Sequence, residues 1–276
     1  MYGAILGDII GSPYEFRNGR RSKDFPLFSS RSRFTDDTVM TIAVAEAIMG
    51  VNNEVPDGVI SDDIIFVMHR WGQKYPDAGY GGRFSQWLRK GCHEPYNSYG
   101  NGSAMRVSSA GWLFDDLATT RRIAGLTAQV THNHPEGIKG AEATAAAIYL
   151  ARTGCSKDKI REYTENEFGY DLSRPCSQIR LGPRHDVSCQ KTVPEAITAF
   201  LEGTDFEDAV RTAVSLGGDC DTLACIAGSI AEAYYSVPAA LKAECRSHLP
   251  EDILGVLDDF EKCRKPRYLA DQNPNA

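Results

Sequence analysis

The 276-residue sequence has no apolar run long enough to cross a membrane and no block of charges of one sign. A membrane-spanning helix needs roughly 18 or more apolar residues in succession. The net charge of -7 is spread along the chain, so electrostatics give no reason to expect binding to nucleic acid or to a membrane surface. The first residues, Met1–Asp8, lack the basic leader and long apolar segment of an export signal. We therefore expect a cytoplasmic protein in which this segment is part of the fold.

The sequence also lacks any Cys-x-x-Cys motif. Its eight cysteines are scattered, at positions 92, 155, 176, 189, 220, 225, 245 and 263. This spacing does not indicate a zinc site or a disulfide framework. We expect reduced thiols, most of them serving as small core residues.

Strand signals are scarce as well, because no alternating segment is followed by a hairpin turn. Helical signals are frequent, and they include Ser61 as an N-cap and Thr204 with Glu207 as a capping box. The helices expected from them cover residues 38–49, 62–71, 135–152, 205–216, 221–235, 238–247 and 250–263. The sequence thus predicts about ten helices in one all-α domain over residues 1–265. Loops are expected at 27–34 and 171–190, and a poorly ordered tail at 266–276.

Two acidic segments stand where a loop becomes a helix, Thr35-Asp36-Asp37-Thr38 and Asp219-Cys220-Asp221-Thr222. Helix capping is one interpretation of each, because Asp and Thr side chains accept hydrogen bonds from N–H groups at helix N-termini. A cap needs only one acceptor, however, and each segment supplies two carboxylates ahead of an apolar helix. Four carboxylates in a partly desolvated site would repel one another unless cations neutralised them. Oxygen ligands favour two Mg²⁺ or Mn²⁺ ions.

Three further segments carry weaker signals. Glu15 follows the glycine-rich Gly7–Gly11 and is a candidate acid or base, although a surface carboxylate is an alternative interpretation. Tyr99–Met105 contains a glycine turn whose N–H groups could meet an anion, or it is a plain turn before a helix. His132 and His134 could donate to phosphate, ligate a metal or cap a helix.

Taken together and in order, these motifs resemble those of the ADP-ribosylglycohydrolases. The resemblance covers roughly residues 1–240. It rests on Gly7-Asp8 with Glu15, Thr35-Asp36-Asp37-Thr38, Gly100-Asn101-Gly102-Ser103-Ala104-Met105-Arg106, Thr131-His132 and Gly217-Gly218-Asp219-Cys220-Asp221-Thr222. It implies a compact, orthogonal bundle of helices with a binuclear magnesium or manganese cleft. It also implies hydrolysis of the bond between C1″ of ADP-ribose and an acceptor.

The resemblance further implies a role for each matching residue. The expected metal ligands are Thr35, Asp36, Asp37, Asp219, Asp221 and Thr222, with Asp221 as a bridge. The expected catalytic residues are Glu15, Asp36 and Asp221. The expected substrate-binding residues are Ser98, Tyr99, Gly100, Asn101, Gly102, Ser103 and His132. The partner would be a protein or small molecule bearing ADP-ribose, and we expect a monomeric protein.

The sequence departs from the family pattern at two positions. Arginine-specific members have an acidic residue three positions before the Asn of the glycine turn, where this chain has Ser98. Serine cannot form the charge-assisted pair that an aspartate makes with arginine, so the serine or O-linked type is favoured. Glu232 stands where many members have Gly. Two other functions stay open, a non-catalytic ADP-ribose or nucleotide binder and a two-metal phosphoesterase that attacks the diphosphate.

Overall fold

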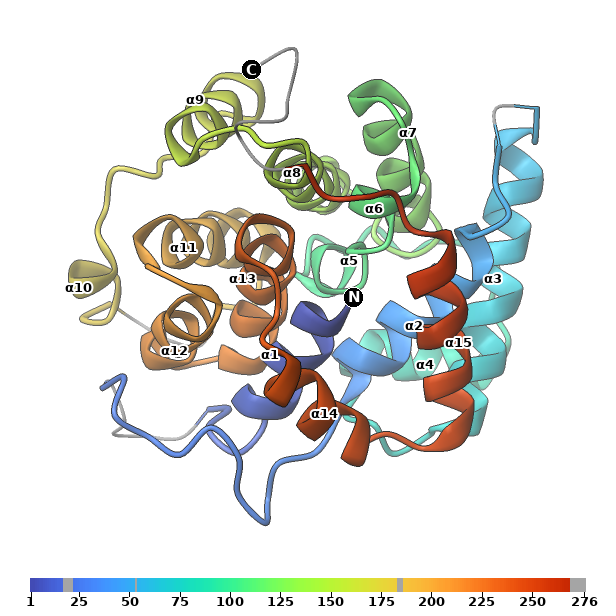
Figure 1. The fold of residues 1–276 in the computed structure, drawn as a ribbon. Helices are drawn as coiled ribbons and strands as arrows, with labels where there is room; N and C mark the ends of the chain where they lie inside the picture. The colour runs from blue at the N-terminus through green and yellow to red at the C-terminus, as the bar shows by residue number, and fades with distance from the viewer. Residues whose placement is uncertain (17–21, 53, 183–185, 269–276) are drawn as a thin grey trace.

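The computed structural model describes residues 1–276 except 17–21, 53, 183–185 and 269–276. Twelve helices of nine residues or more form the described chain (Figure 1). They are α1 (Tyr2–Gly11), α2 (Asp36–Ile48), α3 (Asp57–Lys74), α4 (Gly82–Lys90), α7 (Leu117–Gln129), α8 (Pro135–Arg152), α9 (Lys157–Phe168), α11 (Cys189–Glu202), α12 (Phe206–Leu216), α13 (Cys220–Tyr235), α14 (Ala239–Ser247) and α15 (Glu251–Cys263).

Three single-turn helices complete the bundle, α5 (Gly102–Met105), α6 (Ala110–Leu113) and α10 (Cys176–Ile179). The described residues contain no strand, and the pairing closest to one is an isolated antiparallel bridge between Gly100 and Ser188. The predicted all-α class is confirmed. The predicted number of about ten helices was too low: the described residues form twelve longer helices, and the three single turns are too short to show a helical period.

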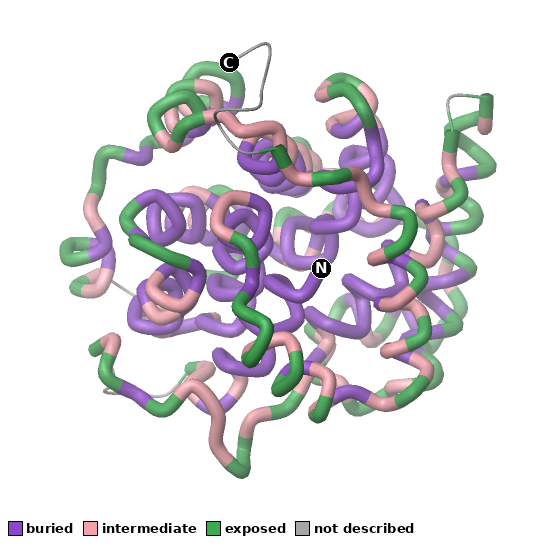
Figure 2. The backbone as a smooth tube through the Cα atoms, in the orientation of Figure 1, coloured by how far each residue is buried: buried purple, intermediate pink, exposed green. Residues whose placement is uncertain are grey.

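Helix α13 lies at the centre of the bundle, with α1, α8, α11 and α12 packed around it (Figure 1). Every residue of α1 is buried, which confirms that the first segment belongs to the fold. Figure 2 shows the buried stretches gathered in the middle of the molecule and the exposed ones at its rim. The two helices that begin at the acidic segments, α2 and α13, are both largely buried.

Two predicted helix starts were wrong. Helix α3 begins at Asp57 with Pro56 as its N-cap, so Ser61 lies inside the helix. Helix α12 is capped by Asp205, whose side chain accepts from the N–H of Asp208, and not by Thr204. Capping preferences alone do not fix the first residue of a helix.

Other expectations concern single residues and the chain end. All eight cysteines are free, and five of them are buried. Glu232 is buried between α1 and α13, where it accepts from the N–H of Gly3 (2.8 Å) and from the amino group of Met1 (3.3 Å). Of the predicted tail, Tyr268 N–H donates to Arg152 O (2.7 Å). Residues 269–276 lie outside the described residues, so the predicted disorder stays a prediction.

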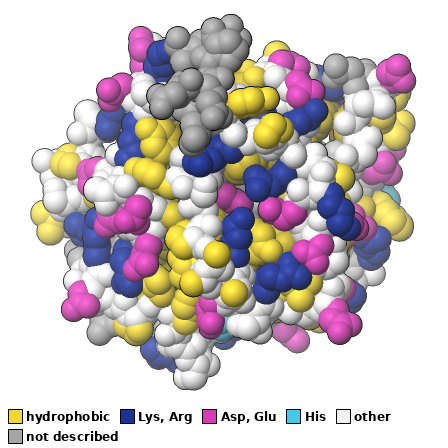
Figure 3. Space-filling model, in the orientation of Figure 1, with side chains coloured by type: hydrophobic (Ala, Val, Ile, Leu, Met, Phe, Trp, Pro, Cys, Tyr) yellow, Lys and Arg dark blue, Asp and Glu magenta, His cyan; other side chains and the backbone are white. Residues whose placement is uncertain are grey.

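The described helices include none that is long and apolar enough to cross a bilayer. On the face in Figure 3, Lys and Arg side chains are interspersed with Asp and Glu. That mixture agrees with the even charge distribution along the sequence.

Candidate active site

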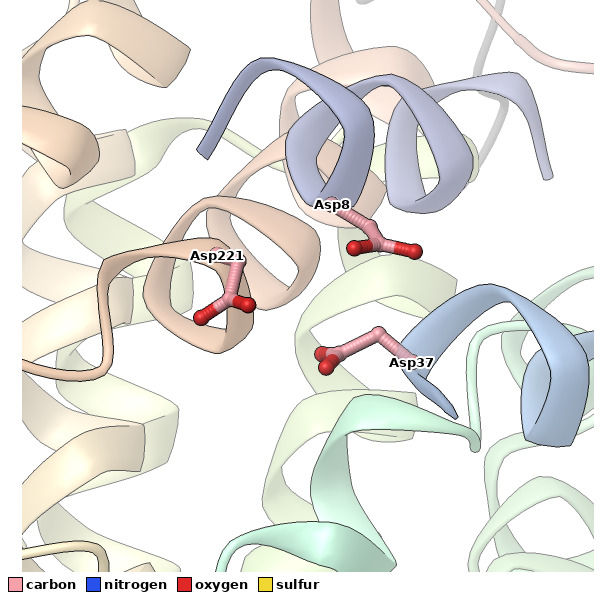
Figure 4. Close-up of side chains that lie close together, drawn as sticks. All are labelled: Asp8, Asp37 and Asp221. Carbon is pink, nitrogen blue, oxygen red and sulfur yellow. The ribbon is translucent and has the colours of Figure 1, made fainter. Parts of the chain in front are cut away.

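Three helices bring acidic side chains to one point. Asp8 of α1, Asp37 of α2 and Asp221 of α13 each offer an oxygen, and these oxygens all lie within 4.8 Å of one another (Figure 4). A second group with the same spacing consists of Glu15, Asp219 and Asp221. Asp221 belongs to both groups, so the two could hold neighbouring cations with Asp221 between them.

The start of α2 is fixed by Asp8. Its carboxylate accepts from the N–H of Thr35 (2.8 Å) and Thr38 (3.1 Å) and from both threonine hydroxyls. Thr35 is the N-cap, and its own side chain accepts from the N–H of Asp37 (3.4 Å). Capping is therefore one task of this segment. Asp8 and Thr35 perform it, which leaves Asp36 and Asp37 for other contacts.

Asp37 carries the clearest sign of a missing partner. Its Oδ2 accepts from the Thr222 hydroxyl (3.2 Å) and the Thr35 hydroxyl (3.5 Å). Its Oδ1 is buried and has no hydrogen-bond partner among the described residues. A buried carboxylate oxygen without a partner is costly, and a hard divalent cation would satisfy it. The residues of this cluster therefore fit a Mg²⁺ or Mn²⁺ ion.

The electrostatics of the cluster agree with this fit. Burial raises the pKa of Asp36 to about 8, and the charges of Asp8 and Asp219 contribute. Burial, followed by neighbouring carboxylates, raises the pKa of Asp37 and Asp221 well above the usual range. Without a counter-charge, these acids would hold protons at pH values where an exposed carboxyl has lost them.

The second acidic segment is held by the glycine turn. Asp219 is the N-cap of α13 but makes no capping hydrogen bond with its side chain. Instead, its Oδ2 accepts from Asn101 Nδ2 (2.6 Å), which also donates to the Thr192 hydroxyl (3.2 Å). Asn101 thus links the turn to the acidic cluster and orients one of its carboxylates.

The backbone of the turn is pinned on both sides. Gly100 N–H donates to the Ser98 hydroxyl (3.1 Å), and Asn101 N–H donates to Val187 O (2.8 Å). The expectation that these N–H groups are free to meet an anion was therefore wrong for both residues. Tyr99 is half exposed, and its ring packs edge-on against His134. Ser103 is fully buried and donates to Gly137 O (2.7 Å).

A cavity of about 200 Å³ opens over the acidic cluster. Ten of the predicted site residues line it, Glu15, Asp36, Asp37, Gly100, Asn101, Gly102, His132, Asp219, Asp221 and Thr222. The predicted residues that do not line it are Thr35, Ser98, Tyr99 and Ser103. The structure therefore brings five separate segments of the sequence to one cavity.

Glu15 reaches the cavity from the end of the α1 segment. The next residue, Phe16, has a positive φ of 46°, and its N–H donates to Gly218 O (2.7 Å). This contact ties Glu15 to the segment that carries Asp219. Burial, together with the charges of Asp219 and Asp8, raises the pKa of Glu15. A raised pKa suits a carboxyl that must carry a proton near neutral pH.

Several residues of the site could not be recognised from the sequence. The motifs include Asp8 but indicate no role for it, and Gly79, Gly81 and Phe84, which line the cavity, belong to none of the motifs. The glycines at 79 and 81 were a visible signal of a loop, but nothing in the sequence indicated which loop faces the acids. Arg106 also lines the cavity although its side chain is buried.

Comparison with known proteins identifies the family of this chain. Human ADP-ribosylhydrolase ARH3 is 28% identical over 92% of this chain and 90% of its own length. The ADP-ribosylarginine hydrolase Tri1 of Pseudomonas putida (strain GB-1) is 25% identical over 86% of this chain and 70% of its own. A solved structure titled "ADP-ribosylglycohydrolase-related protein complex" shares the fold, with a TM-score of 0.67 and 23% identity over 95% of both chains. Residues 1–271 match the ADP-ribosylglycohydrolase family, and the chain therefore belongs to this family of hydrolases.

Proposed function

We propose that this hydrolase cleaves the C1″ glycosidic bond of an ADP-ribosylated protein or small molecule and releases ADP-ribose, with two Mg²⁺ or Mn²⁺ ions as cofactors. The observation that carries this proposal is the convergence of both acidic segments, Glu15 and the glycine turn on one cavity. The family match and the similarity to human ARH3 support the choice of ADP-ribose.

The proposed metal ligands are those expected from the sequence, Thr35, Asp36, Asp37, Asp219, Asp221 and Thr222. Asp37 with Asp221, and Asp219 with Asp221, have the spacing that supports two neighbouring ions. When bound, such ions would supply Lewis acidity toward the hydroxyls of the distal ribose and a water molecule.

Proton donation and the positioning of the sugar are left to the residues around the cavity. Glycosidic cleavage builds positive charge on the sugar, so the leaving group needs a proton and the sugar needs a fixed position. Glu15 lies at the cavity next to the cluster, and its raised pKa supports a role as proton donor. Gly100, Asn101, Gly102 and His132 would line the distal ribose and the diphosphate.

We further propose an O-linked acceptor such as serine. The basis is Ser98, whose hydroxyl accepts from the N–H of Gly100 and which offers no carboxylate to a guanidinium. An arginine acceptor would lack its charge-assisted partner at this position.

The test is incubation of the protein with Mg²⁺ and a panel of substrates. The panel contains Ser-linked, Arg-linked and nucleic-acid-linked ADP-ribose and O-acetyl-ADP-ribose, and mass spectrometry identifies the products. We expect intact ADP-ribose, released faster from serine than from arginine and not released in EDTA. AMP with ribose phosphate would instead indicate a phosphoesterase, and tight binding without any product would indicate a binding protein.

A further inference from the structure

Arg106 is an unusual neighbour for a cavity that already holds many charges. Its side chain is 1% exposed, and one nitrogen, Nη2, donates to Thr127 O and to the Thr131 hydroxyl, each at 2.8 Å. Among the described residues no carboxylate is close enough to raise its pKa, and its Nε is buried without a hydrogen bond. Burial lowers the pKa of Arg106 to about 10, so the guanidinium stays charged at neutral pH.

Thr131 connects this cation to His132. Its Oγ1 lies 2.8 Å from Arg106 Nη2 and 2.8 Å from His132 Nδ1, and Thr131 is fully buried. A guanidinium has only donors, so Thr131 Oγ1 accepts from Arg106. The single hydroxyl hydrogen must then find an acceptor, and His132 Nδ1 is the one that the described residues provide.

The imidazole of His132 has one hydrogen to place. Burial lowers its pKa well below the usual value, and the charges of Arg106 and Arg83 lower it further, so the ring is neutral. If that hydrogen were on Nδ1, the Thr131 hydroxyl would be a buried donor without an acceptor, which proteins avoid. With the hydrogen on Nε2, the Thr131 hydroxyl accepts from Arg106 and donates to His132 Nδ1, so its hydrogen has an acceptor.

Nε2 lies on the side of the ring that faces the glycine turn. A Cβ added at Gly102 would lie 3.2 Å from Nε2, and one added at Gly100 would lie 3.7 Å from it. Both glycines line the cavity together with His132. Because the N–H groups of Gly100 and Asn101 already have acceptors, an N–H at Nε2 would be a donor that this side of the cavity still offers.

We propose that Arg106, acting through Thr131, holds His132 as the neutral tautomer with its hydrogen on Nε2. The cavity then presents a fixed donor to an acceptor oxygen of the ligand, beside a buried positive charge that no carboxylate neutralises. Such a pair suits an anionic oxygen, and a phosphate oxygen of ADP-ribose is the one that the proposed function supplies. The ligand assignment rests on that function, whereas the tautomer does not. Arg106 and Thr131 are positioning residues in this arrangement.

The test uses Thr131→Val, which removes the hydroxyl and keeps the shape of the side chain. Long-range ¹H–¹⁵N NMR of the full chain, without ligand, reports which nitrogen of His132 carries the hydrogen. We expect the Nε2–H tautomer in the wild type, a mixture of tautomers in Thr131→Val and restoration in Thr131→Ser. Calorimetry with ADP-ribose should show affinity weakened about tenfold in Thr131→Val and regained in Thr131→Ser.

Thr144→Val is the matched control. Thr144 is also fully buried, and its hydroxyl has no hydrogen-bond partner among the described residues. This variant should leave the tautomer and the affinity unchanged. A wild-type His132 with its hydrogen on Nδ1 would overturn the proposed role of Arg106 and Thr131. A Thr131→Val protein with wild-type tautomer and affinity would overturn it as well. If the tautomer is as expected but the wild type binds no ADP-ribose, the proposed function and the assigned ligand are wrong, whereas the role of Arg106 and Thr131 in holding the tautomer is supported.

Discussion

Asp8 and Asp37 contribute carboxylates to the same cluster, but their surroundings differ. Asp8 accepts from two N–H groups and two hydroxyls, all from Thr35 and Thr38. A carboxylate has about four lone-pair directions, so Asp8 has little capacity left for a cation. Asp37 keeps a buried oxygen without a partner among the described residues. We infer that Asp8 organises the start of α2 and that Asp37 is the better ligand.

Substitution of these two aspartates by asparagine should separate the two tasks. Asp8→Asn turns one of the two acceptor oxygens into an NH2 donor, so at least one donor of Thr35 or Thr38 loses its acceptor, and unfolding of the metal-free protein should cost about 1–3 kcal/mol less. Asp37→Asn removes an uncompensated charge, so it should leave stability equal or higher but lower metal-dependent turnover by at least about 100-fold. Urea unfolding in EDTA and turnover in Mg²⁺ measure these effects.

The control for both variants is Asp259→Asn, because Asp259 is exposed and pairs with Lys262 at the surface. This variant should change the free energy of unfolding by no more than about 0.5 kcal/mol, and turnover by no more than the rate factor that corresponds to about 0.5 kcal/mol. Wild-type turnover in Asp37→Asn would mean that this carboxylate does not hold a cation.

Asn101 acts on the cluster through Asp219. Replacement by alanine removes the 2.6 Å hydrogen bond to Oδ2 and frees the carboxylate to rotate. Loss of such an orienting contact typically weakens metal binding about 10- to 100-fold. We expect a shift of this size in the Mg²⁺ concentration that half-activates Asn101→Ala. Asn52→Ala, at an exposed turn, is the control. An unshifted Mg²⁺ curve would contradict the role of Asn101.

At the scale of helices, the position of Asp221 depends on how closely α1 approaches α13. A Cβ added at Gly7 would lie 2.1 Å from Ala224 O, and one added at Gly11 would lie 2.4 Å from the Cα of Asp221. Real Cβ atoms do not tolerate such distances, so the helices touch through the backbone at these glycines. Helix α1 therefore contributes Asp8 and also sets the position of the helix that carries Asp221.

Gly7→Ala should consequently damage both fold and site. The helices must separate, which we expect to cost about 1–3 kcal/mol or more of unfolding free energy and to weaken Mg²⁺ activation. Gly255→Ala is the matched control, because Gly255 lies within α15 and a Cβ there would meet nothing within 4 Å. This control should gain about 0.5–1 kcal/mol through helix propensity. Equal melting temperatures for the two variants would refute the close-contact argument.

Which helices could be predicted from the sequence follows from where their signals lie. Helix α8 was predicted with its observed bounds, because Pro135 stands at its first position and an alanine-rich stretch follows. The start of α3 was missed, because its N-cap is Pro56, which makes no side-chain capping hydrogen bond, whereas Ser61 offered a stronger capping signal inside the helix. Helix α5 was missed because it is a single turn, held by the Asn101 carbonyl and the bridge from Gly100 to Ser188. Capping residues and composition predict long helices with clear ends, whereas single turns and uncapped helix starts depend on tertiary packing.

For the whole molecule, the sequence identified the acids but not their neighbours. Asp37 and Asp221 could be paired in advance because four carboxylates near buried helices need a common counter-charge. The place of Gly79 and Arg106 at the cavity could not be predicted, because it results from how α2, α5 and the loop before α4 pack together. The tautomer of His132 is still less accessible from sequence, since it depends on two hydrogen bonds at the Thr131 hydroxyl.

The net effect of these buried acids should be a pH-dependent stability that metal suppresses. The pKa of Asp36 is raised to about 8 by burial and by the charges of Asp8 and Asp219, and burial and neighbouring acids also raise the pKa of Asp37 and Asp221. A carboxyl with a higher pKa in the folded chain holds a proton that the unfolded chain has released. Its contribution to the free energy of unfolding is therefore complete below a pH of about 4, the pKa in the unfolded chain. This contribution is lost as the pH rises through the pKa in the folded chain.

In EDTA we expect the free energy of unfolding to fall by more than about 1 kcal/mol between about pH 5 and about pH 9, since each unit of pKa difference is worth about 1.4 kcal/mol. Saturating Mg²⁺ should remove most of this fall, because a cation that binds only the folded state replaces the lost protons. Urea unfolding at about pH 5, 7 and 9, with EDTA or Mg²⁺, measures both effects. Asp36→Asn should reduce the slope of the EDTA profile between about pH 4 and about pH 8, the unfolded and folded pKa of the group it removes. A flat wild-type profile in EDTA would show that the acidic cluster does not need a counter-charge. The electrostatic argument for two bound cations would then be wrong.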